Sequence, residues 1–186
     1  MKKFNWKKRL IKPSQLTEVG EKIRSKDKTI VYTAGAWDML HVGHIRYLHQ
    51  AKNLADVLIV GVSSNQTIQQ LKGNNRPILD ETIRAEMLSY IRFVDLVTIV
   101  PQKSNQPTIA LLKPDYYVTV KEGWNKGYKD SKEYKTITEH GGEVKLVDRQ
   151  SPFISTTQIL KRSVSSHLNE VLKDFMVTAQ QPLKED

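Results

Sequence analysis

The chain of 186 residues contains no cysteine, so a disulfide framework, a thiolate zinc site and a cysteine nucleophile are all excluded. It also lacks any apolar run long enough to span a membrane. The basic start, MKKFNWKKRLIK, is not followed by the apolar region of a secretory signal. These absences predict a cytoplasmic protein in a reducing setting, with no membrane partner.

Acidic residues are scarce at one end of the chain only. The formal net charge is +9, but residues 1–28 hold ten Lys and Arg against three Asp and Glu, and the remaining 158 residues hold 19 against 17. A basic arm can contact nucleic acid or acidic lipid, but it is more often a solvated end of the chain. The charge pattern therefore does not favour a nucleic-acid partner.

Apolar residues make up 39% of the chain, enough for one core, and from residue 28 apolar β-rich runs alternate with helical patterns. The predicted strands are Thr29–Thr33, Val57–Val62, Leu96–Val100, Tyr116–Val120 and Glu143–Val147. The predicted helices are Gln15–Arg24, Gly43–Asn53, Asn65–Leu71, Glu81–Phe93, Gln106–Leu112, Ser131–His140 and Ser155–Leu172. Strands and helices at this spacing form right-handed βαβ units.

We therefore expect an α/β protein with a Rossmann-like, five-stranded parallel sheet sandwiched by helices, an N-terminal helical arm and a C-terminal helix. The predicted divisions are a basic arm and helix over residues 1–28, a central domain over 29–172 and a polar tail over 173–186.

Ligands of such a sheet gather at the carboxyl ends of the strands, which draws attention to the turn after the first strand. Its Gly35 and Ala36 leave the backbone bare, and Gly43 allows close approach of a ligand at the start of a helix, where free N–H groups favour an anion. His41 and His44 are three residues apart, so both imidazoles can point at that anion. The arrangement suits a polyphosphate. A metal site with Asp38 or His49 as third ligand is the alternative, but His49 falls elsewhere on the helix.

Three motifs resemble those of the small HxGH nucleotidyltransferases. The first is Gly35-x-x-Asp38-x-x-His41-x-Gly43-His44. The second, over residues 71–78 (LKGNNRPI), is similar to the LKGxxRP stretch of the heptose 1-phosphate adenylyltransferases. The third, over residues 154–159 (ISTTQI), resembles the ISTT helix start of the superfamily. The resemblance to the superfamily runs from about Thr17 to Arg162, which is most of the chain.

The resemblance implies transfer of a nucleoside monophosphate from NTP to a sugar phosphate, with release of pyrophosphate. Cations and donors then neutralise charge on the phosphoryl oxygens, and Mg²⁺ accompanies the nucleotide. The implied catalytic residues are His41, His44 and Lys72. The implied nucleotide-binding residues are Ala34, Gly35, Ala36, Trp37, Asp38, Gly43, Arg76, Arg84, Ser155, Thr156 and Thr157. No residue is assigned to a metal site.

The expected acceptor-binding residues follow the fourth predicted strand and are Lys121, Glu122 and Trp124. Here VKEGWN stands where the heptose enzymes tend to have VKGGDY. ATP with a heptose 1-phosphate is the favoured substrate pair. Ile91–Asp95 resembles the RYVD of the cytidylyltransferases, and Arg149 resembles the arginine of their RTEGISTT run, so CTP with glycerol 3-phosphate or a similar alditol phosphate is the alternative.

Two other classes stay open at this stage. One is a nucleotide-binding module without catalysis, although the full set of His41, His44, Lys72 and Ser155 argues for an enzyme. The other is a nucleic-acid-binding synthetase fragment, against which stands the absence of a KMSKS-like segment. A homodimer is compatible with the sequence.

Overall fold

The computed structural model describes residues 4–123, 127–150 and 155–179. Its strands are β1 (Leu10–Ile11), β2 (Ile30–Gly35), β3 (Val57–Ser63), β4 (Leu96–Val100), β5 (Tyr116–Val120) and β6 (Glu143–Val147). Its helices are α1 (Leu16–Arg24), α2 (Val42–Lys52), α3 (Asn65–Lys72), α4 (Glu81–Ser89), α5 (Gln106–Leu112), α6 (Lys132–Glu139) and α7 (Thr156–Ala179). Short 3-10 helices lie at Trp6–Arg9, Pro13–Gln15, Lys121–Gly123 and Tyr128–Asp130.

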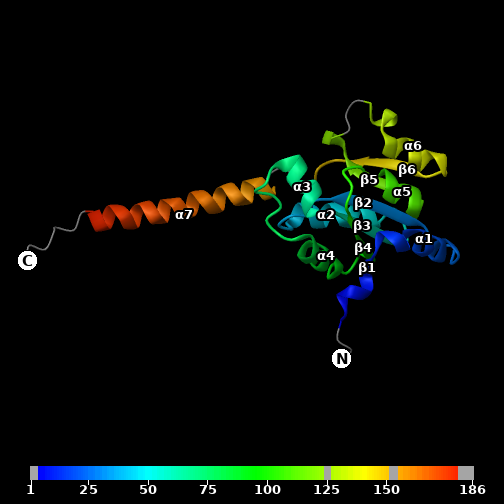
Figure 1. Cartoon of the computed structure of the whole chain (residues 1–186), viewed down its shortest axis with the longest axis horizontal. Coiled ribbons are helices and arrows are strands. Elements are labelled where there is room, and N and C mark those ends of the chain that lie inside the picture. The colour runs from blue at the N-terminus through cyan, green and yellow to red at the C-terminus, as the bar shows by residue number, and fades with distance from the viewer. Residues whose placement is uncertain (1–3, 124–126, 151–154, 180–186) are drawn as a thin grey trace, which may run out of the picture.

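The six strands form one parallel sheet in the order β1-β4-β3-β2-β5-β6 (Figure 1). The predicted α/β class and parallel sheet are confirmed, but the count of five strands was one short. The additional strand is β1, where Leu10 and Ile11 pair with Val97 and Thr98 of β4. A two-residue strand inside a basic segment has no periodic signal, and its pairing depends on the open edge of β4. The N-terminal segment is thus part of the sheet.

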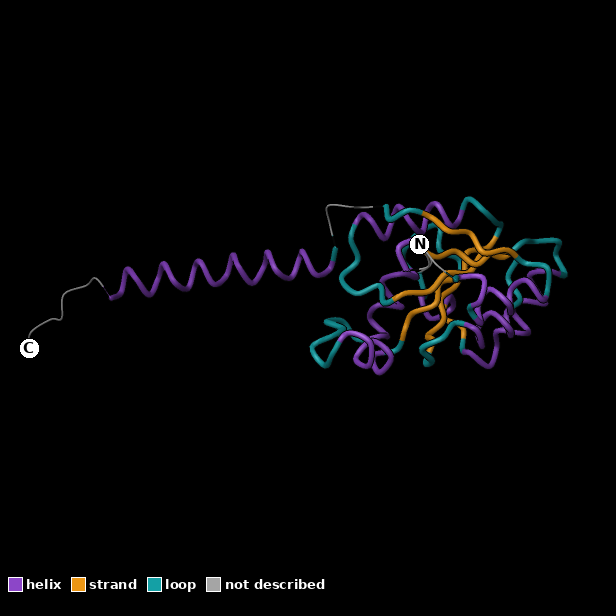
Figure 2. The backbone as a smooth tube through the Cα atoms, turned by 90° about the horizontal axis from the view of Figure 1, so that it is seen from above, coloured by secondary structure: helices purple, strands orange, loops and turns teal. Residues whose placement is uncertain are grey.

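Helices cover both faces of the sheet (Figure 2). On one face, α2 and α4 bury Leu48, Ala51 and Leu88 against Val31, Val60 and neighbouring strand residues. On the other, α1, α5 and α6 bury Leu16, Ile109 and Ile137 against Ile30 and Ile59. Both faces of the sheet are therefore buried, which explains why the strands are continuous apolar runs in the sequence.

Two helices end four or more residues from the expected position, whereas the other helix ends lie within one residue of it. Helix α4 ends at Ser89 rather than Phe93. The Arg9 guanidinium donates hydrogen bonds to the carbonyls of Ser89, Ile91 and Val94, at 2.8, 3.1 and 2.8 Å, where the helix ends. Helix α7 runs on to Ala179, into the segment assigned to a polar tail, and projects away from the domain (Figure 1). In the part of the chain that the structure describes, no helix is both long and apolar enough to cross a membrane.

The strand order places the site. From β2 the chain proceeds to β3 and β4 on one side and later to β5 and β6 on the other. The carboxyl ends of β2 and β5 therefore flank the point where the order reverses, which is where a parallel sheet leaves a crevice.

Candidate active site

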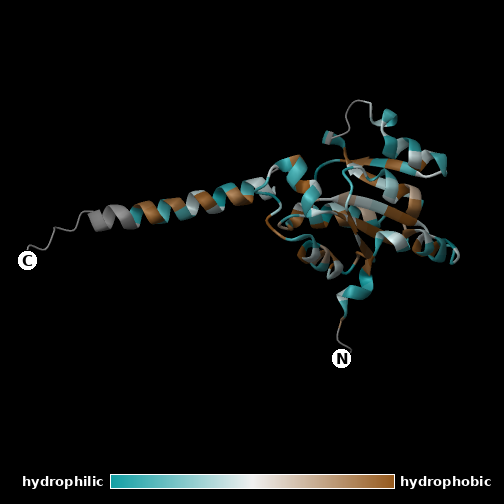
Figure 3. Cartoon of the chain, in the orientation of Figure 1, coloured by the Kyte–Doolittle hydropathy of each residue, from teal (hydrophilic) through white to brown (hydrophobic). Residues whose placement is uncertain are grey.

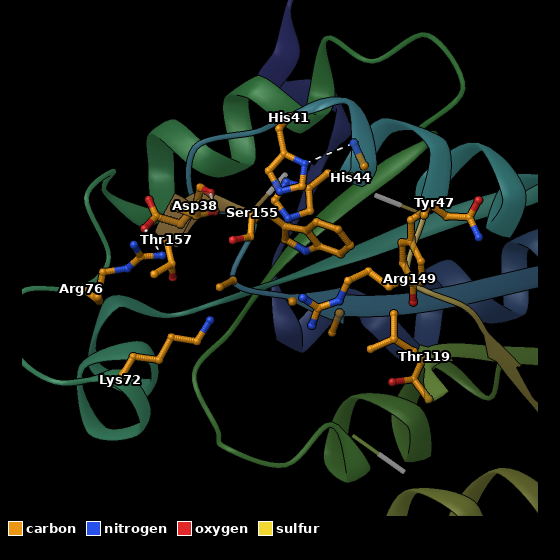
Figure 4. Close-up of a pocket in the computed structure, with 18 residues that line it drawn as sticks. Asp38, His41, His44, Tyr47, Lys72, Arg76, Thr119, Arg149, Ser155 and Thr157 are labelled. Carbon is orange, nitrogen blue, oxygen red and sulfur yellow. Dashed lines mark hydrogen bonds and ion pairs between the residues drawn. The ribbon is translucent and has the colours of Figure 1, made fainter. Parts of the chain in front are cut away.

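A cavity of about 400 Å³ opens at the carboxyl ends of β2 and β5 (Figure 4). Its wall includes every residue predicted as catalytic or nucleotide-binding except Arg84. Five further residues complete the described wall, namely Tyr47, Thr119, Val120, Arg149 and Gln150. Segments more than a hundred residues apart in the sequence therefore meet at one site.

The two histidines lie face to face at the start of α2. Their ring centroids are 3.9 Å apart with the planes inclined by 21°. His41 caps the helix, because its Nδ1 accepts a hydrogen bond from the Gly43 amide at 3.1 Å. This bond fixes the tautomer of His41, leaving the proton on Nε2 as a donor when the ring is neutral.

Both histidines are held in the neutral form. Burial, with the charge of Arg149, lowers the pKa of His41. Burial lowers the pKa of His44 to about 4, assisted by His41 and Lys72 and opposed by Asp38. The buried Nδ1 of His44 has no hydrogen-bond partner among the described residues. Near pH 7 the pair therefore offers neutral N–H donors rather than two positive charges.

Positive charge comes instead from three longer side chains, which approach from different elements (Figure 4). Lys72 ends α3, Arg76 lies in the loop that follows, and Arg149 follows β6. Burial lowers the pKa of Lys72, and the charges of Arg76 and Arg149 lower it further, against the opposing effect of Asp38. Lys72 and Arg76 lie near Asp38, and Arg149 lies near Glu122. A polyphosphate in the cavity would relieve the mutual repulsion of the three cations.

Asp38 organises the loop that carries Arg76. Its buried carboxylate accepts hydrogen bonds from the Ile78 amide at 3.0 and 3.2 Å and from the Leu79 amide at 3.1 Å. The Arg76 guanidinium pairs with it at 3.1 Å. Asp38 lines the cavity, but these contacts show that it joins the turn after β2 to the loop after α3.

Arg84 does not reach the cavity, which corrects its assignment as a nucleotide ligand. Its side chain is completely buried in α4. The guanidinium donates to the carbonyls of Leu79 at 2.9 Å, Ala36 at 2.5 Å and Ser63 at 2.8 Å, and to Oδ1 of Asn65 at 2.8 Å. Through these hydrogen bonds, Arg84 connects the turn after β2, the end of β3 and the loop before α4.

The start of α7 forms another part of the cavity wall, beside Asp38. Ser155, Thr156 and Thr157 line the cavity, and Ser155 Oγ caps the helix by accepting from the Gln158 amide at 3.2 Å. The Thr156 hydroxyl donates to the Asp38 carbonyl at 2.6 Å. The N-terminal ends of α2 and α7, both favourable to anions, therefore border the same cavity.

The turn between β2 and α2 is held in an uncommon backbone conformation. Trp37 and Met39 both have φ of 51°, a region that non-glycine residues rarely adopt and that tends to mark functional loops. Trp37 is anchored by a hydrogen bond from its indole N–H to the Gly61 carbonyl at 2.8 Å and packs edge-on against His44. We infer that buried Trp37 supports the turn rather than stacking on a ligand.

The predicted acceptor-binding residues Lys121 and Glu122 do not line the described part of the cavity. Lys121 pairs with Asp148 at 2.9 Å, and Glu122 lies 3.8 Å from the Arg149 guanidinium, all four side chains being at least half exposed. Trp124 lies outside the described residues. Lys121 and Glu122 thus join the segment after β5 to the segment after β6, and the β5 residues that line the cavity are Thr119 and Val120.

Among the residues that sequence reasoning missed, Tyr47 had a usable signal. It lies three residues after His44, on the same face of α2, and its hydroxyl lies 2.7 Å from Thr33 Oγ1 and donates to the Val118 carbonyl at 2.9 Å. Thr119, Val120 and Gln150 had none, because only the folded sheet places them beside the HxGH turn.

No group of three or more His, Cys, Asp or Glu side chains that could hold a metal ion occurs among the residues described. His49, the alternative third ligand, packs edge-on against Phe93 at 5.2 Å.

The fold and the site together define a nucleotidyltransferase domain. An HxGH turn, a phosphate-binding set of cations and an ISTT helix start meet at the switch point of a parallel sheet. A sequence model of the family described as cytidylyltransferase-like matches residues 32–162. The chain belongs to the cytidylyltransferase-like family, and the predicted nucleotidyltransferase superfamily is confirmed.

Relatives at the sequence level include proteins named bifunctional protein HldE. That of Campylobacter jejuni subsp. doylei is 39% identical over 140 residues, covering 75% of this chain and 29% of the relative. That of Campylobacter fetus subsp. fetus is 36% identical over 164 residues, covering 87% and 32%. The chain therefore spans about 30% of the length of these curated relatives.

A solved structure is also similar. It is described as the lipopolysaccharide core biosynthesis protein from Thermoplasma volcanium, with 28% identity and a TM-score of 0.54, covering 66% of this chain and 96% of that one.

Proposed function

We propose that this chain transfers a nucleoside monophosphate from NTP, with ATP favoured, to a sugar phosphate such as a heptose 1-phosphate. The observation that carries the proposal is the convergence of Lys72, Arg76 and Arg149 on a pair of neutral histidines, with Asp38 as the acidic neighbour. The bifunctional HldE relatives and the lipopolysaccharide core biosynthesis protein support a sugar-phosphate acceptor.

In the proposed reaction, an oxygen of the acceptor phosphate attacks the α-phosphorus of the nucleotide. A new phosphorus–oxygen bond forms as the bond to the β-phosphate bridging oxygen breaks, and pyrophosphate leaves with that electron pair. The attacking oxygen is already an anion, so the reaction requires no general base. The chain's contribution is to position both substrates and neutralise charge on the phosphoryl oxygens.

The side chains divide this work. Lys72 and Arg76 hold the β- and γ-phosphates from the side of α3, where a point charge and a planar fork reach different oxygens. The neutral histidines donate N–H groups toward the α-phosphoryl oxygens, where charge grows in the transition state. The α7 start contributes its free amides and the Thr157 hydroxyl.

Mg²⁺ would enter with the nucleotide and help to neutralise the triphosphate. The described part of the cavity wall contains one carboxylate, that of Asp38, and its oxygens are already engaged by Arg76 and two backbone amides. The residues fit an ion that is held by phosphate oxygens and water rather than by a protein cage.

The acceptor would lie on the β5 side of the cavity. Thr119 Oγ1 and the Arg149 guanidinium are polar groups on that side of the cavity (Figure 4). Lys121 and Glu122 would affect acceptor choice indirectly, because their ion pairs join the two segments that flank Arg149.

CTP with glycerol 3-phosphate or a similar alditol phosphate is the second candidate. It is favoured by Arg149, which lines the cavity ahead of the ISTT helix start. The Ile91–Asp95 segment adds no support, because Asp95 accepts the Leu58 amide at 2.7 Å and pairs with Lys52 at 2.6 Å, away from the cavity wall.

The deciding experiment is a pyrophosphate-release screen of four NTPs against sugar and alditol phosphates, with product masses measured. We expect the highest kcat/KM for ATP with a heptose 1-phosphate. Higher kcat/KM for CTP with glycerol 3-phosphate would replace the favoured pair by the second candidate. Nucleotide binding without pyrophosphate release from any pair would favour a binding module and contradict the proposed reaction.

A further inference from the structure

Strands β2 and β5 separate at the floor of the cavity. The last residue pair in their register is Thr33 with Val118. After this pair, β2 continues along β3 to Gly35, and β5 continues along β6 to Val120. Gly35 and Val120 both line the cavity. The cavity therefore begins where the two strands stop pairing.

Three buried groups are hydrogen-bonded to one another at this point. The hydroxyls of Thr33 and Tyr47 each donate to the Val118 carbonyl at 2.9 Å, and the two hydroxyl oxygens are 2.7 Å apart. We call this arrangement the hydroxyl triangle. None of the three residues is more than 7% exposed, and the sheet around them is predominantly hydrophobic (Figure 3). If either hydroxyl is removed, the other still has a proton to donate to the carbonyl.

Within the hydroxyl triangle, Tyr47 is the residue that joins different elements. Thr33 and Val118 belong to strands that are already paired, whereas Tyr47 belongs to α2 and extends from it toward β5 (Figure 4). His44 lies three residues before Tyr47, on the same side of the helix. The Trp37 ring packs against both, with its centroid 5.5 Å from that of His44 and 5.9 Å from that of Tyr47. The bond from Tyr47 to β5 therefore fixes the position of His44.

The same bond relates the two sides of the proposed reaction. His44 lies on the α2 side, where the nucleotide would bind. Thr119 directly follows Val118 in β5 and lies on the side proposed for the acceptor. In-line transfer requires the attacking oxygen and the phosphorus to lie about 3–3.5 Å apart, and a displacement of about 1 Å can lower the rate about a hundredfold. A hydroxyl that fixes α2 against β5 is therefore placed to set that distance.

We propose that Tyr47 is a positioning residue, whose hydrogen bond to the Val118 carbonyl holds the histidines at the start of α2 at the distance from the acceptor side that the transfer requires. This inference rests on the proposed function. Because the Tyr47 hydroxyl is engaged by the protein, it acts through the placement of α2 rather than by touching a substrate. Burial raises the pKa of Tyr47, so the hydroxyl keeps the proton that it donates.

The first test compares two variants that each remove one hydroxyl from the triangle, Tyr47→Phe and Thr33→Val. Tyr47→Phe releases α2 from β5 and should lower kcat at least about tenfold, while the Kd of a non-hydrolysable NTP and that of the acceptor change less than about threefold. Thr33→Val leaves Tyr47 bonded to Val118, so kcat should stay within about threefold of the parent value. Pyrophosphate release with the substrate pair that the screen identifies measures kcat, and calorimetry measures the two Kd values.

This matched pair separates positioning from stability, because both variants lose a buried hydroxyl from the same place. Urea denaturation checks that both are folded. An equal fall of kcat in the two variants, or an unchanged kcat in Tyr47→Phe, would overturn the proposal. So would a Tyr47→Phe chain that does not fold, since the hydroxyl would then determine stability rather than position.

The second test needs no catalysis. NMR titration of the ligand-free chain measures the pKa of His44, which burial lowers to about 4. Tyr47→Phe should let the first turn of α2 move outward and raise that pKa to about 5 or higher, because burial decreases. Thr33→Val should leave the pKa of His44 at the parent value.

The two tests distinguish this proposal from the proposed function. A parent chain that releases no pyrophosphate from any substrate pair would contradict the proposed function, and the titration would still decide whether Tyr47 positions the histidine. An unchanged pKa of His44 in Tyr47→Phe would overturn the positioning role, whatever the activity of the parent chain.

Discussion

The environment of His44 differs from that of a surface histidine. His44 is packed between His41 and Trp37, with a pKa lowered to about 4. A neutral imidazole in this position attracts a ground-state phosphate only weakly. It contributes most where negative charge is growing, so its effect should fall on the rate rather than on binding.

His44→Ala should lower kcat about a hundredfold while the Kd of the nucleotide changes less than about threefold. Steady-state kinetics and calorimetry with a non-hydrolysable NTP separate the two effects. His49→Ala is the control, because His49 lies on the same helix but packs against Phe93. An unchanged kcat in His44→Ala would remove the histidine from the mechanism.

For Arg84 we expect a substitution to lower the stability of the fold rather than the rate of the reaction. Replacing it with methionine leaves the carbonyls of Ala36, Ser63 and Leu79 without their donor in a buried place, which should lower the free energy of unfolding by about 3–4 kcal/mol. Urea denaturation measures this loss, with exposed Arg92→Met as the matched control. A variant of unchanged stability that lost nucleotide affinity would instead identify Arg84 as a ligand.

At the scale of elements, the two-residue strand β1 completes the edge of the sheet beside β4. Leu10 and Ile11 cover the outer edge of β4, and Arg9 binds the three carbonyls that end α4 and the turn after it. None of these residues lines the cavity. The segment therefore stabilises the sheet without taking part in the chemistry.

Removing residues 1–12 should lower the free energy of unfolding by about 2–4 kcal/mol, through the lost burial of Ile11 and the lost bonds of Arg9. NTP preference should stay the same at temperatures where the domain is folded. The single change Arg9→Met should reproduce part of the loss, and exposed Lys8→Met should not. Altered NTP preference in the folded, shortened chain would mean that the segment belongs to the site.

At the scale of the whole molecule, the site affects the pH dependence of folding. The ordinary pKa of histidine is 6.5, and that of folded His44 is about 4. As the pH falls below 6.5, the unfolded chain binds a proton before the folded chain does. The contribution of neutral His44 to stability is therefore fully present above about pH 6.5 and is lost as the pH falls toward 4.

We expect the free energy of unfolding to decrease by about 1–3 kcal/mol between pH 6.5 and 4 on account of His44. The measurement is urea denaturation across this pH range for the parent chain and for His44→Asn. In the variant, the decrease in the free energy of unfolding that comes from His44 should be absent. His167→Asn, on the exposed surface of α7, should leave the slope unchanged. Equal slopes in the parent and in His44→Asn would show that the histidine is not held neutral by folding.

The sequence by itself determined the alternation of strands and helices, and with it the parallel sheet, because strands buried on both faces must be apolar throughout. It also determined the position of the HxGH turn, since the carboxyl end of a strand followed by a helix is a local feature. The chemistry of His41, Lys72 and Arg76 followed from residue type and from that position.

Only the tertiary structure decided which cations face the cavity. Arg84 and Arg76 are both arginines near the same loop, yet one binds four acceptors inside the protein and the other lines the cavity. The difference depends on which carbonyls the loops leave unpaired when the turn after β2 meets the loop after α3. Thr119 and β1 were decided in the same way, because each acts through a partner distant in sequence, and local pattern carries no record of such a partner.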